Sequence, residues 1–213
     1  MAGSARSDPL LATVIVMTVI LLCGAGVVNG QTTITPEPES RFWIEGASNV
    51  NRFDCEAATF EGEMEIEPEL PEELADEIRG EINLELRIPV LSFECGRRRM
   101  NRDFYEALKS DSHAYIHFEY LDTRVLEQLE KPAGEEGNHW LLEVEGVLTV
   151  AGTSRTIMFN AEGGVLDEKR VRVRGHKPIL MTDYDIDPPT ALLGVVRAQD
   201  ELTVYFDILA TIH

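Results

Sequence analysis

Apolar and polar residues alternate along almost the whole chain from residue 41 onward. In FEGEMEIE (60–67), Phe60, Met64 and Ile66 fall on one side of an extended chain and four glutamates fall on the other. A period of two is typical of a β-strand with one buried face. The same pattern recurs in eight further segments: 41–46, 50–57, 81–90, 114–122, 140–150, 156–163, 170–175 and 201–210. Nine strands separated by turn residues predict a single antiparallel sheet that closes on itself.

Breaks in the alternation predict where this sheet bends. The pattern shifts by one position between Cys55 and Phe60, which indicates an extra residue near Ala58 and therefore a β-bulge. Glycines inside strand segments indicate further sharp bends. These glycines are Gly62, Gly146 and Gly163.

Helical patterns are confined to two short segments. One is EELADEI (72–78), and the other is NRDFYEALKS (101–110), in which Phe104 and Leu108 stand four residues apart and share a helix face. We expect helices of this length to plug or flank a closed sheet rather than to form a layer of their own.

The N-terminal segment predicts export. An uncharged apolar run at 10–28 follows a short leader and precedes small residues, as in a secretory signal peptide, with cleavage expected after Gly30. The alternative is an uncleaved membrane anchor, because a run of about 18 or more apolar residues can span a bilayer. The predicted organisation is a signal peptide at 1–30, a proline-containing linker at 31–40 and one folded domain at 41–213. The expected location is the periplasm or the outside of the cell.

Net charge limits the partners that the chain can bind. The formal charge is −19 at pH 7, whereas nucleic acids and anionic membrane surfaces attract basic patches. We therefore expect no nucleic-acid partner, and membrane contact only through an N-terminal segment that stays uncleaved. The sequence leaves the oligomeric state open.

Cysteine content predicts one disulfide. Cleavage of the signal peptide removes Cys23 and leaves Cys55 and Cys95. An even number of cysteines in an exported protein is first interpreted as a bridge. In the chain-entropy account, a bridge across a loop of about 40 residues contributes roughly 4 kcal/mol to stability.

Five motifs follow one another in a fixed order along the chain: RDFYEALKSD (102–111), YIHFEY (115–120), GVLTVAGTS (146–154), MTDYDIDPPTALLG (181–194) and DELTVYFDI (200–208). Their order resembles the YceI-like family of exported proteins that bind lipids or polyisoprenoids. The resemblance extends over about residues 41–210. The chain departs from the family pattern at Asp185 and in a longer acidic insertion at 67–81.

The resemblance implies an all-β, lipocalin-like antiparallel barrel with one or two short helices, whose lumen binds an isoprenoid lipid, a quinone or a similar amphiphile. Barrels of about eight strands can enclose one small ligand. The residues alone favour a filled interior over a ligand cavity, and the family resemblance favours the cavity. We expect Phe104 to act as a gate. The predicted barrel lining is Ile82, Leu84, Leu86, Phe104, Trp140, Leu142, Val144, Leu148, Ile157, Phe159, Leu202, Val204 and Phe206.

A basic cluster precedes the second predicted helix. Arg97, Arg98 and Arg99 are candidates for binding the head group of the ligand, because guanidinium groups match phosphate and pyrophosphate oxygens. The alternative, which the acidic composition favours, is that these arginines pair with neighbouring glutamates.

No set of residues predicts catalysis. His113 and His117 are four residues apart, but in a strand this spacing separates them by about 13 Å. DYDID (183–187) begins like a calcium-binding loop, yet Pro188 stands where that loop requires glycine. We therefore expect no enzymatic activity, no metal site and no cofactor. The alternative to a lipid carrier is a packed envelope protein that acts through its surface and binds no small ligand.

Overall fold

Each of the nine predicted strands is present in the computed structural model, which describes residues 32–68, 80–130, 138–191 and 193–213. Three short strands accompany them. The strands are β1 (Thr32–Pro36), β2 (Arg41–Ser48), β3 (Arg52–Ala57), β4 (Glu61–Pro68), β5 (Gly80–Pro89), β6 (Phe93–Glu94), β7 (Tyr115–Leu129), β8 (His139–Val150), β9 (Thr153–Val165), β10 (Arg170–Leu180), β11 (Thr190–Ala191) and β12 (Val196–Ile212). The helical elements are α2 (Arg98–Ala107) and two 3₁₀ turns, η2 (Val90–Ser92) and η3 (Met181–Tyr184).

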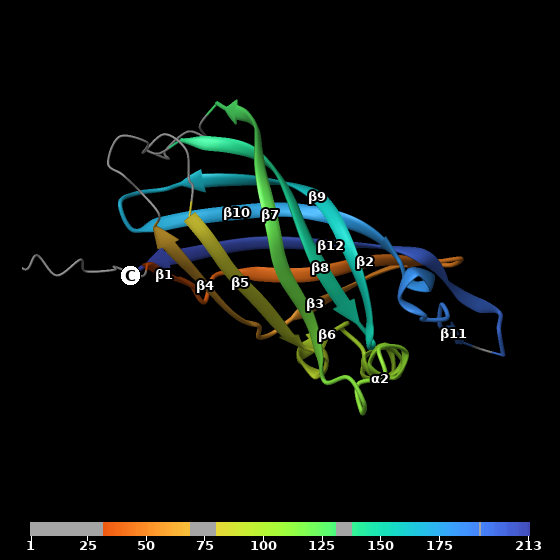
Figure 1. Ribbon diagram of the computed structural model, residues 1–213. Coiled ribbons are helices and arrows are strands. Elements are labelled where there is room, and N and C mark those ends of the chain that lie inside the picture. The colour runs from red at the N-terminus through yellow and green to blue at the C-terminus, as the bar shows by residue number, and fades with distance from the viewer. Residues whose placement is uncertain (1–31, 69–79, 131–137, 192) are drawn as a thin grey trace, which may run out of the picture. The chain divides into compact units, whose positions relative to one another are not determined.

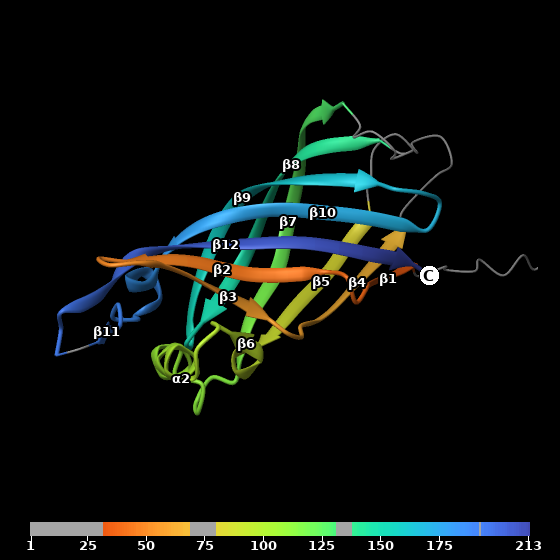
Figure 2. The same ribbon diagram turned by 180° about the vertical axis from the view of Figure 1, so that it is seen from behind.

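The strands form one curled antiparallel sheet. Its order runs β4-β5-β7-β8-β9-β10-β12, and β1 lies between β12 and β4, so that the sheet closes into a barrel. The first half of β12 pairs instead with β2, which carries β3 and β6 beyond it. Figures 1 and 2 show the long strands curling around a shared interior, with α2 at the end where β8 turns into β9. The predicted lipocalin-like barrel is confirmed.

Strand β1 occupies a segment that the sequence predicts to be a linker. We expected residues 31–40 to lack regular structure because of their prolines, and this is wrong for Thr32–Pro36. Ile34 pairs with Met64 on one side and with Ile212 on the other, and its side chain is buried. The β-branched residues of TTIT suit this position, and the first proline only ends the strand.

The extra residue expected near Ala58 is a strand break rather than a bulge. The chain leaves the sheet between Ala57 and Glu61, so that β3 pairs with β6 while β4 pairs with β5. Ser92 holds the break, because its carbonyl accepts a hydrogen bond from the Ala58 N–H at 2.9 Å and its hydroxyl donates to the Thr59 carbonyl at 3.0 Å. The shift in the alternation thus predicted the correct place for the bend, but the chain leaves the sheet over several residues there instead of inserting one.

Helix α2 begins three residues before the predicted 101–110 segment and therefore includes part of the basic cluster. Asn101 fixes its start, since the side chain accepts a hydrogen bond from the Cys95 N–H at 2.8 Å and donates one to Glu94 at 2.5 Å. The helix predicted at 72–78 lies outside the described residues. Of the helices in the described part of the chain, none is long and apolar enough to cross a membrane.

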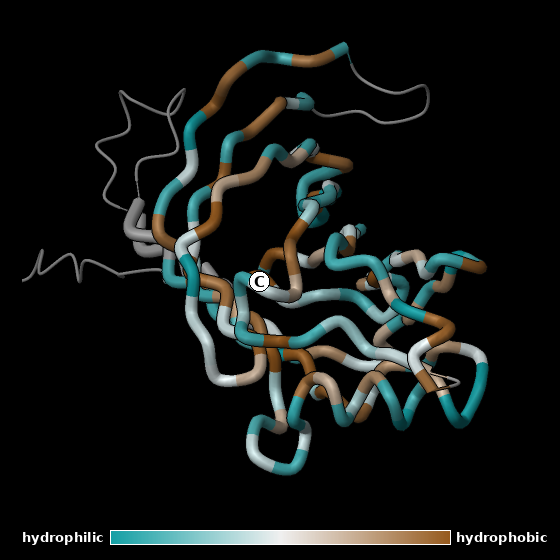
Figure 3. Tube along the Cα trace, turned by 90° about the vertical axis from the view of Figure 1, so that its right-hand side faces the viewer, coloured by the Kyte–Doolittle hydropathy of each residue, from teal (hydrophilic) through white to brown (hydrophobic). Residues whose placement is uncertain are grey.

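The predicted disulfide joins Cys55 on β3 to Cys95, the residue after β6. It belongs to the main cluster of buried apolar residues, which contains the largest fully buried side chains: Tyr184, Phe93, Ile88, Val90 and Cys55. Figure 3 shows apolar and polar residues alternating along the strands, as the period of two requires. The disulfide is therefore part of the main buried apolar cluster of the described chain.

Candidate functional site

The strand register places the predicted lining on one face of the sheet. Leu86 pairs with Phe118, which pairs with Leu148, and Val144 pairs with Phe159 in the same register. Residues directly opposite in paired strands share a face, and every second residue along a strand returns to it. The predicted strand residues that meet this condition are Leu84, Leu86, Trp140, Leu142, Val144, Leu148, Ile157, Phe159, Leu202, Val204 and Phe206. Ile82 lies on β5, but its side chain is outside the described set.

Much of this inner face is only partly covered by the described residues. Trp140, Leu142, Phe159 and Phe206 are half-buried, although they point to the interior of the barrel. Val125, which faces Leu142 across β7 and β8, is 59% exposed. An interior filled by its own side chains would bury such residues. Away from α2, the inner face therefore forms an apolar trough that the described residues do not fill.

Two inward glycines keep large rings flat against the barrel wall. A Cβ atom at Gly146 would lie 2.4 Å from the Phe118 ring, and one at Gly175 would lie 2.7 Å from the Phe206 ring. Each ring thus covers the neighbouring strand where that strand has no side chain. We predicted Gly146 to mark a bend; the structure shows that the missing side chain provides space for this ring.

A cavity of about 190 Å³ lies at the α2 end of the barrel. Four of the predicted lining residues border it: Phe104, Leu148, Leu202 and Val204. The other predicted strand residues lie on the same face of the sheet, outside the cavity wall. Several other residues of this wall were not among the predicted lining residues, including Phe42, Ile44, Phe53, Met181 and Ile186. Phe42 and Ile44 alternate on β2, so the pattern that identified the other strands could have identified them.

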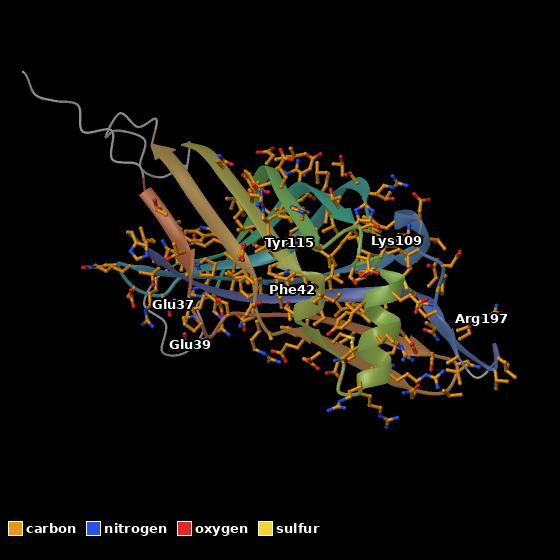
Figure 4. All side chains as sticks on the ribbon, turned by 90° about the horizontal axis from the view of Figure 1, so that it is seen from below. Glu37, Glu39, Phe42, Lys109, Tyr115 and Arg197 are labelled. Atoms are coloured by element: carbon orange, nitrogen blue, oxygen red, sulfur yellow. A yellow bond between two sulfur atoms is a disulfide. The ribbon has the colours of Figure 1, made fainter. Side chains whose placement is uncertain are left out.

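Helix α2 supplies one wall of the cavity. Met100, Phe104 and Ala107 face it, and Figure 4 shows the helix lying across the end of the barrel. The Phe104 ring packs 5.2 Å from the ring of Phe93, which is fully buried. The Tyr105 hydroxyl donates a hydrogen bond to the Phe93 carbonyl at 2.6 Å. Phe104 is therefore part of a fixed wall in this structure.

The segment that resembles a calcium loop closes the cavity from another side. Asp185 accepts a hydrogen bond from the Thr153 hydroxyl at 2.9 Å, and Asp200 accepts one from the Thr182 hydroxyl at 2.6 Å. These bonds fix η3 against β9 and β12, so that Met181 and Tyr184 form part of the cavity wall. Among the described residues, no group of three or more histidine, cysteine or acidic side chains is placed to hold a metal ion.

Tyr184 on η3 brings a polar group to the cavity wall. The residue is 2% exposed and borders the cavity, and within the described chain no hydrogen bond to its hydroxyl is present. Burial, reinforced by the nearby charge of Asp183, raises the pKa of Tyr184 to about 12. The hydroxyl thus stays protonated below that pH and can donate a hydrogen bond. Tyr184 was not among the predicted site residues, because the similarity of its segment to a calcium-binding loop drew attention to the aspartates alone.

The cavity opens beside the β2–β3 turn and β11. Asn51 and Thr190 are the exposed members of its wall. Asp103 on α2 also borders it and lies 3.7 Å from Arg99 and 3.9 Å from Arg102. The rest of the wall is almost entirely apolar, so the site can exclude water from a hydrocarbon while it offers polar groups at the rim.

The basic cluster lies at the start of α2 and is exposed. Arg99 pairs with Asp103, an aspartate on the same helix, rather than with a glutamate. Within the described residues, Arg97 and Arg98 form no ion pair. Both side chains are exposed to solvent, and neither borders the cavity.

Comparisons with known proteins agree with the fold. A family model described as a YceI-like domain matches residues 31–210. A polyisoprenoid binding domain from Saccharophagus degradans, implicated in plant cell wall breakdown, has a TM-score of 0.59 and 15% identity over 84% of this chain and 97% of that chain. BcnA from Burkholderia cenocepacia has a TM-score of 0.56 and 18% identity over 80% of this chain and 96% of that chain. A search of curated proteins found no match. At these identities the two structures share the fold with this chain.

Proposed function

Because this chain belongs to the YceI-like family, we propose that it is an exported carrier that binds an isoprenoid lipid, a quinone or a similar amphiphile inside its barrel. The observation that supports this most is the apolar cavity of about 190 Å³ under α2. The similar domain from Saccharophagus degradans is described as polyisoprenoid binding. Binding of this kind uses burial and needs no catalytic group.

The volume of the cavity suggests how a long ligand would lie. At about 10–15 Å³ for each water position, the cavity has room for on the order of a dozen waters, and these occupy roughly 400 Å³ of liquid. Ligand pockets range from roughly 300 to 1,000 Å³, so this one fits a ring or the first part of a chain. The half-buried trough beyond Phe159 and Phe206 is apolar and would hold the remainder. Each methylene buried there contributes about 0.8 kcal/mol.

Export is part of the proposal, and two features support it. The apolar run at 10–28 has the character of a signal peptide. The disulfide between Cys55 and Cys95 suits an oxidising compartment. A carrier in that compartment would exchange its ligand with a membrane or with another protein.

One experiment on protein purified from its native host tests both parts of the proposal. We expect the intact mass to correspond to a chain that begins near Gln31, and organic extraction to release an isoprenoid lipid or quinone detectable by mass spectrometry. The ligand-free protein should then take up a fluorescent polyprenyl probe. A protein that yields no amphiphile and takes up no probe would instead support a packed envelope protein that acts through its surface. An intact Met1 would support the uncleaved anchor.

Two variants are expected to separate the classes of head group. Changing Arg97, Arg98 and Arg99 together to alanine should weaken binding of a polyprenyl pyrophosphate about tenfold, because several exposed ion pairs at up to ~1 kcal/mol each are lost. The same change should leave a quinone unaffected. Tyr184→Phe should weaken a quinone about fivefold, the effect of one neutral hydrogen bond to a carbonyl, and should change pyrophosphate binding little. Titration calorimetry with both ligands measures all four affinities.

The matched control for the arginine variant is Arg124→Ala, because Arg124 is exposed on β7 and pairs with Glu143. It should leave both affinities unchanged. Equal losses for both ligands in the arginine variant would contradict a head-group role for the cluster and indicate a general effect on α2.

A further inference from the structure

Three exposed apolar side chains gather at one end of the molecule. Val50 lies in the β2–β3 turn and is 64% exposed; Leu193 and Val195 lie between β11 and β12 and are 107% and 69% exposed. We call these three residues the apolar tip. Figures 1 and 2 both show the two turns at the same end of the barrel. Exposed apolar residues that gather at one place mark an interaction site more often than scattered ones do.

Hydrogen bonds from one residue tie the two turns together. The Asn49 side chain donates to the Val195 carbonyl at 2.9 Å and accepts from the Arg197 N–H at 2.9 Å, while the Asn49 N–H donates to the Arg197 carbonyl at 3.1 Å. These bonds hold Val50 and Val195 in fixed relative positions. The tip is therefore preformed.

Leu193 is held in an unfavourable backbone conformation. Its φ is 56°, in the left-handed region that residues other than glycine seldom adopt, and the Gly194 N–H closes the turn on the Ala191 carbonyl at 3.1 Å. The turn thus keeps a leucine fully in solvent at its outermost position. Strain of this kind tends to occur where a residue has a function.

The two segments that carry the apolar tip contain basic residues and no acidic ones. Segments 46–53 and 188–199 contain no aspartate or glutamate, whereas the whole chain contains 38. Both segments carry an arginine instead, Arg52 and Arg197, and both arginines are exposed. Figure 4 shows Arg197 at this outer end. The net charge of −19 would repel an anionic membrane, but this end presents apolar and basic groups to it.

The same two turns border the opening of the cavity. Asn51 follows Val50 by one residue and Thr190 precedes Leu193 by three, and both are exposed members of the cavity wall. A surface that contacts the apolar tip therefore also faces the opening of the cavity. A lipid that leaves this surface would travel only a short distance through water before it enters the cavity.

From this arrangement we propose that the apolar tip inserts into the interface of a lipid bilayer, with Arg52 and Arg197 at the level of the phosphates, and so positions the cavity opening for lipid exchange. The proposal rests on the proposed function for its purpose, but membrane contact can be measured without any cargo. Apolar side chains that enter the acyl boundary, together with cations that face the head groups, are the known basis of interfacial binding. A protein partner would not require the absence of acidic residues, so the bilayer fits better.

The test compares the ligand-free protein with Leu193→Glu/Val195→Glu on vesicles of phosphatidylethanolamine and phosphatidylglycerol. We expect the bound fraction in co-sedimentation to fall at least fivefold. The rate of transfer of a fluorescent polyprenyl probe from such vesicles should fall about tenfold, while uptake of the probe from detergent micelles stays within twofold of wild type. The charge-matched control is Leu121→Glu/Met158→Glu, whose two positions are 48% and 51% exposed on β7 and β9. This control should behave as wild type in all three measurements.

Equal vesicle binding by wild type and by Leu193→Glu/Val195→Glu would overturn the membrane-contact proposal, whatever the cargo results. If the wild type binds vesicles through the tip but takes up no probe even from micelles, the membrane contact holds and the proposed carrier function fails. Arg52→Glu/Arg197→Glu should reduce binding more on vesicles that contain phosphatidylglycerol than on neutral ones. An identical reduction on both kinds of vesicle would contradict the proposed contact of Arg52 and Arg197 with the lipid phosphates.

Discussion

Replacing Cys55 and Cys95 together by alanine is expected to lower the free energy of unfolding by about 4 kcal/mol. The two residues are 40 positions apart, and a cross-link over a loop of this length removes conformational entropy from the unfolded chain worth ~4 kcal/mol in the loop-closure account. Because the free energy of unfolding of most domains is only roughly 5–15 kcal/mol, the variant should lose a large part of its stability. Urea unfolding followed by circular dichroism measures the difference.

The location of the bridge predicts a second effect. Cys95 lies between β6 and α2, and its N–H is held by the Asn101 side chain. Loss of the bridge should thus loosen the helix that forms one cavity wall and speed release of the ligand. Reduced wild type should resemble the double variant in both measurements. A stability change below 1 kcal/mol, or two titratable thiols in the native oxidised protein, would contradict the bridge.

The alternation of apolar residues predicted the sheet because strand burial is a local property of the chain. Each strand must bury one face, so the period of two appears in every segment, and the inner face could be assigned residue by residue. The strand β1 was missed because Thr32–Pro36 contains only one large apolar residue, and a single residue cannot show an alternation. Ile34 is buried only because β4 and β12 approach it from both sides.

The cavity could not be predicted to the same degree, because it depends on which part of the inner face α2 and η3 cover. That arrangement follows from contacts between distant segments, such as the bond of Lys109 to the Asp185 carbonyl. The alternation therefore could not separate Leu202, which borders the cavity, from Trp140 and Leu142, which lie on the same face outside the cavity wall.

The net charge of the chain also did not predict the local charge at the apolar tip. A net charge of −19 argues against contact with anionic surfaces when the charge is treated as uniform. The two acid-free segments are more than 100 residues apart in the sequence, and only the Asn49 hydrogen bonds show that they meet. The expectation of no membrane contact by the folded domain was based on the net charge of the whole chain, whereas the proposed contact depends on the local charge at the apolar tip.

Filling the cavity is expected to weaken ligand binding about 100-fold while the barrel stays folded. Ala107 is half-buried at the end of α2 and borders the cavity, so the indole of Ala107→Trp would enter the cavity itself. An indole that takes the place of three or four ligand methylenes, at about 0.8 kcal/mol each, should weaken binding of a polyprenyl probe about 100-fold. Because the new ring fills empty space, stability should change by less than about 1 kcal/mol.

The matched control is Glu106→Trp, which puts the same side chain on the exposed neighbour of Ala107 and should leave both binding and stability unchanged. Fluorescence titration with the probe and thermal unfolding of the three proteins separate the two effects. A longer polyprenyl chain should lose the same factor as a short one, since only the part inside the cavity is displaced, whereas the part in the trough beside Phe159 and Phe206 keeps its contacts. If Ala107→Trp folds and still binds the probe as tightly as wild type, the ligand does not occupy the cavity, and the trough alone would have to hold it.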